Sequence, residues 1–154
     1  MSILAALVLG LFALDGEASA CAGAAGARVE APAQPTLGAI LDAIRCAETG
    51  GQPHGGRDAT GDRGRAIGPF QIHRAYFLDS GVDGRYEDCR EPEFARRVVL
   101  AYWKRWCPDA LERCDAEVLA RVHNGGPKGA ERSGTLAYWR KIEQRLAART
   151  WTSG

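Results

Sequence analysis

The apolar residues that follow position 36 recur at the spacing of one helix face. Four of them lie three or four positions apart, namely Leu37, Ile40, Leu41 and Ile44. Glu48 takes the next position on the same stripe, so its carboxyl should point inward. Thr36 is a good N-cap, and the Gly50-Gly51 pair is typical of a left-handed helix end. The pattern therefore predicts a first helix that carries Glu48 into a glycine-rich turn.

Similar signals predict four further helices. They cover residues 69–78, with Pro69 in the first turn, residues 91–106, residues 115–122, and a last helix that begins at Ser133 or Thr135. The region between residues 51 and 68 contains too much glycine for a helix and has room for a small hairpin at most. We therefore expect a mainly α fold of the α+β kind, with about five helices and a small loop or hairpin region.

The position of Glu48 on an apolar stripe has a chemical consequence. Burial disfavours a charged carboxyl and raises its pKa toward the range in which it can donate a proton near neutral pH. A glutamate in the last turn of a helix is more often ordinary surface, so this position alone does not establish a catalytic acid.

A second carboxylate lies in the turn that follows. Asp62 is flanked by Gly61 and Arg63, and the chain then passes through Gly64 to Gly68 and Pro69. A turn this rich in glycine and proline can fix an aspartate opposite Glu48. Paired carboxylates of this kind predict a site that cleaves glycosidic bonds.

Four segments carry a resemblance to a known family. They are Cys-Ala-Glu-Thr-Gly-Gly (46–51), Gly-Asp-Arg-Gly-Arg-Ala-Ile-Gly-Pro-Phe-Gln-Ile (61–72), Ala-Arg-Val-His-Asn-Gly-Gly-Pro (120–127) and Leu-Ala-Tyr-Trp-Arg-Lys-Ile (136–142). In this order they resemble the invertebrate-type lysozymes, also called the destabilase family, and their bacterial relatives. The resemblance covers roughly residues 37–142 and implies a lysozyme-like catalytic domain.

The resemblance also implies a substrate and a set of residues that bind it. We expect hydrolysis of the β-1,4 bond between N-acetylmuramic acid and N-acetylglucosamine in peptidoglycan. Five residues are expected to line the glycan cleft: Gln71, Tyr76, His123, Asn124 and Gly125. Two of these assignments have structural alternatives, because Gln71 can be an amide that ties its turn together and residues 123–127 can be a helix end with a proline stop.

In the expected mechanism, Glu48 is the general acid, and Asp62 is the nucleophile or stabilises the oxocarbenium-like centre. Asp58 is the alternative second carboxylate if Asp62 does not have this role. Two other functions stay open. A lytic transglycosylase would use Glu48 alone, and a non-catalytic glycan-binding module or inhibitor would bind cell walls without turnover. Family members with isopeptidase activity use serine and histidine residues. This chain has Arg65, and not serine, two residues after the Gly-Asp-Arg segment, so we do not expect isopeptidase activity.

The beginning of the chain predicts export. Residues 1–14 are apolar almost throughout and Ala18-Ser19-Ala20 follow, so residues 1–20 are typical of a signal peptide. Residues 21–35, mostly alanine, glycine and proline, are typical of a flexible tether. The catalytic domain should then span residues 36–148, with a tail at residues 149–154. Removing the signal peptide leaves 20 basic and 17 acidic residues, a formal charge of +3, which weakly suits an anionic cell wall.

Four cysteines in an exported domain predict two disulfides with three alternative pairings. We favour Cys107 with Cys114 and Cys46 with Cys89, because the first pair closes a short loop. A metal site is the weaker alternative, because the chain contains no Cys-x-x-Cys pair. Cys21 directly follows the small residues and is a candidate for a lipid anchor.

The remaining expectations are mostly absences. The formal charge of the whole chain is only +1 and there is no basic run, so we expect no nucleic-acid partner. The sequence shows neither a His-x-x-x-His pair nor a phosphate loop, so we expect no metal and no cofactor. We expect a secreted or periplasmic monomer, or a membrane-anchored lipoprotein, with peptidoglycan strands as its partner and no transmembrane span in the mature chain.

Overall fold

The computed structural model describes residues 34–150, and the side chains up to residue 148. The predicted signal peptide, most of the tether with Cys21, and the last four residues lie outside the described residues. No helix in the described part of the chain is both long and apolar enough to cross a membrane.

The described residues are mainly helical, with a small sheet between the first two helices. The α-helices are α1 (Leu37–Thr49), α2 (Arg74–Ser80), α3 (Pro92–Trp106), α4 (Pro108–Glu112), α5 (Ala116–Gly125) and α6 (Leu136–Thr150). The strands are β1 (Thr60–Gly61), β2 (Ala66–Ile67) and β3 (Ile72–His73). Short 3₁₀ turns are η1 (His54–Gly56), η2 (Asp62–Gly64), η3 (Tyr86–Arg90), η4 (Gly129–Glu131) and η5 (Ser133–Thr135). The predicted mainly α fold with a small hairpin region is confirmed.

Helix α1 has the predicted ends and the predicted inner face. The Thr36 side chain accepts a hydrogen bond from the Ala39 amide at 3.2 Å, which satisfies one of the free donors at the start of the helix. Gly50 ends the helix in the left-handed conformation, with φ of 63°. Ile40 and Ile44 are fully buried. The inward stripe therefore runs along α1 as expected.

The second helix begins later than the sequence predicts. We expected residues 69–78, but α2 spans Arg74–Ser80, because the chain first turns back at Gln71, where φ is +47°. The Gln71 amide donates to the Gly68 carbonyl, and β3 then pairs antiparallel with β2. Strand order β1-β2-β3 gives a three-stranded sheet in which each strand is only two residues long.

Two other helices differ from the predicted ones. Helix α4 follows Cys107 and was not predicted, since Pro108 starts a new helix directly after α3 ends. Helix α5 continues to Gly125 rather than stopping at residue 122, and Gly126 caps it. His123 therefore lies in the last turn of a helix and not in the loop beyond it.

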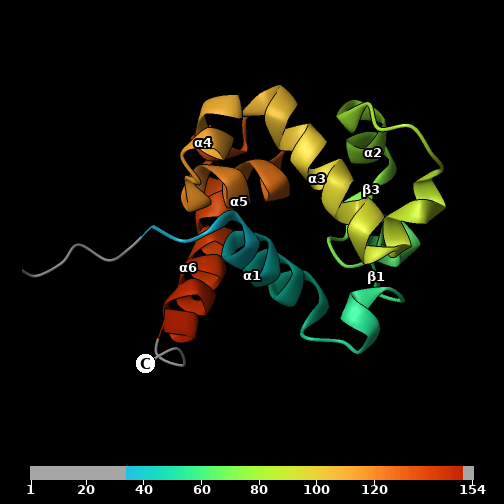
Figure 1. Cartoon of the computed structure of the whole chain (residues 1–154), viewed down its shortest axis with the longest axis horizontal. Helices are drawn as coiled ribbons and strands as arrows, with labels where there is room; N and C mark the ends of the chain where they lie inside the picture. Colours follow the sequence, from blue (N-terminus) through green and yellow to red (C-terminus); the bar gives the residue numbers. More distant parts are fainter. Residues whose placement is uncertain (1–33, 151–154) are drawn as a thin grey trace, which may run out of the picture. The chain divides into compact units, whose positions relative to one another are not determined.

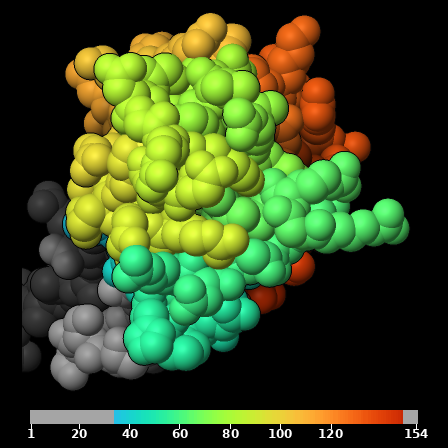
Figure 2. All heavy atoms as spheres, turned by 90° about the vertical axis from the view of Figure 1, so that its right-hand side faces the viewer, coloured from blue at the N-terminus to red at the C-terminus, as the bar shows by residue number. Residues whose placement is uncertain are grey.

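The helices enclose one hydrophobic core. In Figure 1, α1 and α6 lie side by side, α5 lies close to both, and α3 runs from the region of α2 and the small sheet to α4. The fully buried side chains come from several elements and include Ile44, Ile72, Trp103, Leu119 and Ile142. Figure 2 shows the face with the hairpin, where the green segment around residues 60–66 stands out from the surface. Helices α1, α2, α5 and α6 all bring polar side chains to one region, described next.

Candidate active site

Glu48 lies at the end of α1, with its carboxylate turned toward α6. Its side chain is only 19% exposed, as expected from its place on the apolar stripe. The Tyr138 hydroxyl donates to Glu48 Oε1 at 2.6 Å, across 90 residues of sequence. This short bond to a carboxylate oxygen is of the strong, charge-assisted kind. The side chain of Glu48 is therefore partly buried and held in one orientation.

His123 flanks the same carboxylate from the end of α5. Its Nε2 lies 3.8 Å from Glu48 Oε1, and its side chain is 5% exposed. Burial lowers the pKa of His123, while the charge of Glu48 and a hydrogen bond with the Phe70 backbone act in the opposite direction. Since burial is the largest of these effects, the uncharged imidazole is favoured beside the acid.

Two tyrosines lie on the side of His123 opposite Glu48. The Tyr76 hydroxyl lies 3.3 Å from His123 Nδ1, and the Tyr76 ring stacks on Tyr102 with ring centroids 3.7 Å apart. Burial raises the pKa of Tyr76 well above its usual value, and the nearby Tyr102 and Cys107 add to this effect. The stack fixes the imidazole from the side opposite Glu48.

The second predicted carboxylate, Asp62, lies in the exposed turn between β1 and β2. Its backbone has φ of 47°, and Arg63 after it has φ of 58°, so two consecutive residues adopt the left-handed conformation. The Arg65 guanidinium lies 2.7 Å from Asp62 Oδ1, and His73 Nε2 lies 3.8 Å from Oδ2. Asp62 is therefore held by two basic side chains that face its two oxygens.

A tyrosine stabilises the hairpin that carries Asp62. The Tyr86 hydroxyl lies 2.7 Å from the Arg65 carbonyl and 2.8 Å from the Ile72 carbonyl. One hydroxyl thus joins the end of the Asp62 turn to β3. The close contact of Gly61 with Gln71 Oε1, where a Cβ atom would approach to 2.3 Å, tightens the same hairpin.

The structure brings together only part of the predicted binding set. Glu48, Tyr76 and His123 form one cluster. The Gln71 side chain donates to the Gly68 carbonyl at 2.9 Å, so it ties its turn as the structural alternative predicts. Asn124 is exposed in the last turn of α5, and Gly125 packs so closely on Thr135 that a Cβ would lie 2.6 Å from its Cγ2. The binding roles of all five predicted residues stay predictions.

Sequence reasoning did not single out Tyr138 as a site residue. The residue belongs to the Leu-Ala-Tyr-Trp segment, and it lies four positions before the fully buried Ile142 on the same face of α6. That spacing is the signal by which it could have been found. Tyr102, the stacking partner of Tyr76, is buried in the core.

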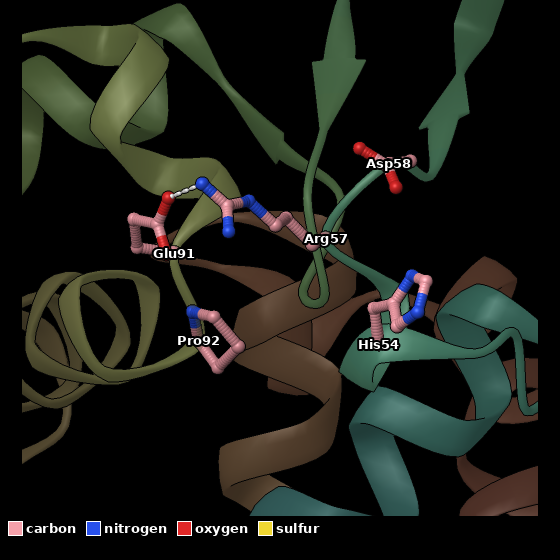
Figure 3. Close-up of a pocket in the computed structure, with 5 residues that line it drawn as sticks. All are labelled: His54, Arg57, Asp58, Glu91 and Pro92. Carbon is pink, nitrogen blue, oxygen red and sulfur yellow. Dashed lines mark ion pairs between the residues drawn. The ribbon is translucent and has the colours of Figure 1, made fainter.

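Asp58, the substitute for Asp62, lines a different and open pocket of about 650 Å³. Figure 3 shows this pocket with the ion pair between Arg57 and Glu91 on one side and the Asp58 and His54 side chains on the other. Pro92 at the start of α3 completes the lining. Neither Glu48 nor Asp62 lines this pocket, so it is separate from the cluster around Glu48.

The four cysteines between residues 34 and 150 are free thiols in the structure, so the two predicted disulfides are not confirmed. Burial raises the pKa of Cys89 to about 12 and that of Cys107 to about 11, so both are protonated near neutral pH. Within residues 34–150, no group of three or more histidine, cysteine, aspartate or glutamate side chains is arranged to hold a metal ion.

Comparison with known proteins points to one family. A family model described as Destabilase matches residues 41–145. A lysozyme of Ostrea edulis is 35% identical over 83 residues, which cover 53% of this chain and 61% of that protein. Invertebrate-type lysozyme 6 of Caenorhabditis elegans is 31% identical over 121 residues, which cover 68% of this chain and 86% of that protein. The chain thus spans less than two thirds of the Ostrea protein.

Solved structures agree with the sequence matches. The crystal structure of Tapes japonica lysozyme superposes with a TM-score of 0.56 at 32% identity. The superposition covers 73% of this chain and 91% of the Tapes japonica chain. Meretrix lusoria lysozyme in complex with Aeromonas hydrophila PliI gives a TM-score of 0.56 at 28% identity, with 74% and 93% covered. The residues matched by the family model include Glu48, and the comparisons together show that this chain belongs to the Destabilase family, with invertebrate-type lysozymes among its relatives.

Proposed function

We propose that the chain is a lysozyme, a glycoside hydrolase that cleaves the β-1,4 bond between N-acetylmuramic acid and N-acetylglucosamine in peptidoglycan. The observation that carries the proposal is the carboxyl of Glu48, which is 19% exposed and accepts the Tyr138 hydrogen bond at the end of α1. A partly buried carboxyl of this kind suits a general acid. The lysozymes among the relatives support the choice of reaction.

In the proposed reaction, the protonated Glu48 gives its proton to the glycosidic oxygen. The bond between that oxygen and the sugar carbon C1 breaks, and its electron pair leaves with the oxygen. The positive charge that develops at C1 is stabilised or trapped by the Asp62 carboxylate. Water then attacks C1 and returns a proton to Glu48, which restores the enzyme.

The surroundings of Asp62 favour a second candidate as well. Arg65 contacts Oδ1 at 2.7 Å and His73 approaches Oδ2, so both oxygens already face basic partners. A nucleophile needs a free oxygen, whereas a lytic transglycosylase needs Glu48 alone. In that reaction the substrate's own 6-hydroxyl attacks C1, and a 1,6-anhydro product is released.

Mass analysis of the fragments released from peptidoglycan distinguishes these reactions. A hydrolase gives reducing ends that carry one added water, whereas a transglycosylase gives 1,6-anhydro ends. Glu48→Gln is the control, since both reactions require the acid. Binding to peptidoglycan without any fragment release would contradict both and leave the glycan-binding module or inhibitor.

The proposal extends to the location of the enzyme. We propose export through a signal peptide at residues 1–20, with residues 21–35 as a tether and Cys21 as a candidate lipid anchor. The apolar beginning and the small residues before Cys21 support this. The mass of the mature protein tests it, because cleavage after residue 20, with or without an added lipid, gives distinct values.

A further inference from the structure

The Tyr138 hydroxyl donates a hydrogen bond to an acidic side chain, that of Glu48. It reaches Glu48 from α6, the helix that packs beside α1. The separation of 2.6 Å is at the short end for an O–H donor and a carboxylate oxygen. The bond is therefore a specific contact between two helices and directly concerns the proposed acid.

Both polar neighbours of Glu48 face the same oxygen. Tyr138 donates to Oε1, and His123 Nε2 lies 3.8 Å from Oε1. His123 has little freedom to move, because its ring contacts the Phe70, Tyr76 and Trp103 rings edge-on. Oε1 is thus the inner oxygen of the carboxyl, and Oε2 is the one left to carry the proton.

We propose that Tyr138 is the positioning residue of Glu48. Its hydroxyl holds Oε1, so that Oε2 presents the proton to the glycosidic oxygen. When the proton leaves, the carboxylate of Glu48 stays hydrogen-bonded to Tyr138. This inference rests on the proposed function, because it concerns the same acid. It adds a residue and a role that neither the family resemblance nor the catalytic pair supplies.

The chemistry favours the transition state over the bound substrate. A phenol donates more strongly to a carboxylate than to a neutral carboxyl, so the Tyr138 bond tightens as Glu48 loses its proton. An interaction that strengthens only at that point raises kcat and leaves KM nearly unchanged.

Burial and the neighbouring charges keep the Tyr138 hydroxyl protonated, so it remains a hydrogen-bond donor. Burial raises its pKa far above the usual value, the charge and the hydrogen bond of Glu48 raise it further, and Arg145 on α6 only partly opposes this. Tyr76 is the other phenol that faces Tyr138, and burial keeps it protonated too. Tyr138 therefore stays neutral throughout the pH range of the enzyme and donates at every pH tested.

The test is the rate of peptidoglycan cleavage by Tyr138→Phe as a function of pH. We expect kcat to fall about tenfold, which corresponds to about 1.4 kcal/mol, with KM changed by less than twofold. The donor favours the ionised form of Glu48, so its removal should also move the alkaline limb of the profile up by about one pH unit. A role in packing alone lowers stability and moves no limb.

Tyr86→Phe is the matched control. It removes a phenol hydroxyl that lies within 2.8 Å of two backbone carbonyls and makes no contact with Glu48. It should lower the melting temperature and leave the alkaline limb in place. If Tyr138→Phe does not fold, 3-fluorotyrosine at position 138 keeps the shape with a stronger donor and should move the limb to lower pH.

The outcomes separate this inference from the proposed function. Loss of activity in Glu48→Gln, together with an unmoved limb in folded Tyr138→Phe or in the fluorotyrosine protein, overturns only the role of Tyr138. Full activity of folded Glu48→Gln overturns the proposed function itself. A limb that moves in both Tyr138→Phe and Tyr86→Phe also counts against a specific role for Tyr138.

Discussion

Replacement of Gly129 by alanine should strongly destabilise the domain, although the change adds one methyl group. A Cβ at this position would lie 1.9 Å from the Arg121 carbonyl oxygen and 3.0 Å from the Val122 Cα. Ordinary contacts of a Cβ atom begin at about 3.4 Å. The obstacle is the backbone of α5, one turn before its end, so no side chain can rotate away.

The size of the effect follows from that geometry. The chain around η4 must move away from α5 by roughly 1.5 Å, which would also strain the 2.8 Å bond from the Thr135 hydroxyl to the Gly129 carbonyl. Overpacking typically costs about 1 to 3 kcal/mol, and a clash with rigid backbone belongs at the upper end. For a domain of this size, about 3 kcal/mol lowers the melting temperature by roughly 10 °C.

Gly134→Ala is the matched control. Nothing lies within 4 Å of the Cβ position there, so the same substitution should be neutral or stabilise by up to about 1 kcal/mol through the unfolded chain. Thermal and urea unfolding of the two variants measure the difference. Equal stability of Gly129→Ala and Gly134→Ala would refute the packing of α5 against η4 that is described above.

Three further predictions concern the site. Glu48→Gln keeps an acceptor for Tyr138 but has no proton to give, so peptidoglycan cleavage should fall by about 10² to 10⁴ with little change in melting temperature. Glu143→Gln, at an exposed position of α6, should retain the rate of the original protein, and an active Glu48→Gln protein would exclude Glu48 as the acid. Asp62→Asn should cost about a hundredfold in rate and flatten the acidic limb, whereas Asp58→Asn should do little. The reverse result would transfer the role to Asp58, and no effect from either would favour the transglycosylase. Burial lowers the pKa of His123, so the unfolded chain binds this proton first and stability should decrease as the pH falls below about 6.5. Urea unfolding at pH 7.5 and 5.5 should show a smaller difference in His123→Gln, whereas the exposed His54→Gln should leave the difference unchanged.

The parts of the fold that local patterns encode were predictable. The stripe on α1, the Thr36 cap and the left-handed Gly50 follow from residues within one helix, and all three are confirmed. The start of α2 was not predicted correctly, since Pro69 is a good first residue for a helix. A positive φ at Gln71 and the pairing of β3 with β2 override that preference, and both depend on contacts that local spacing does not reveal.

The candidate site was predictable only in part, for the same reason. Glu48 could be found because its own helix shows where it points. Its contact with Tyr138 joins α1 to α6, and helical periodicity says nothing about which helices become neighbours. Asp62 was identified as a carboxylate in a rigid turn, but its contacts with the Arg65 and His73 side chains depend on the fold of the hairpin.

The hydrogen bond between Glu48 and Tyr138 also determines the stage of synthesis at which the Glu48 carboxyl gains its donor. Glu48 is synthesised before its donor, so any product that stops before α6 contains the proposed acid without the group that orients it. Closing so long a loop costs entropy that the docking of α6 on α1 and α5 offsets. Local fraying of the last helix would therefore remove the Tyr138 donor and lower the proposed activity about tenfold while the rest of the domain stayed folded, so the rate would report whether α6 is docked on α1.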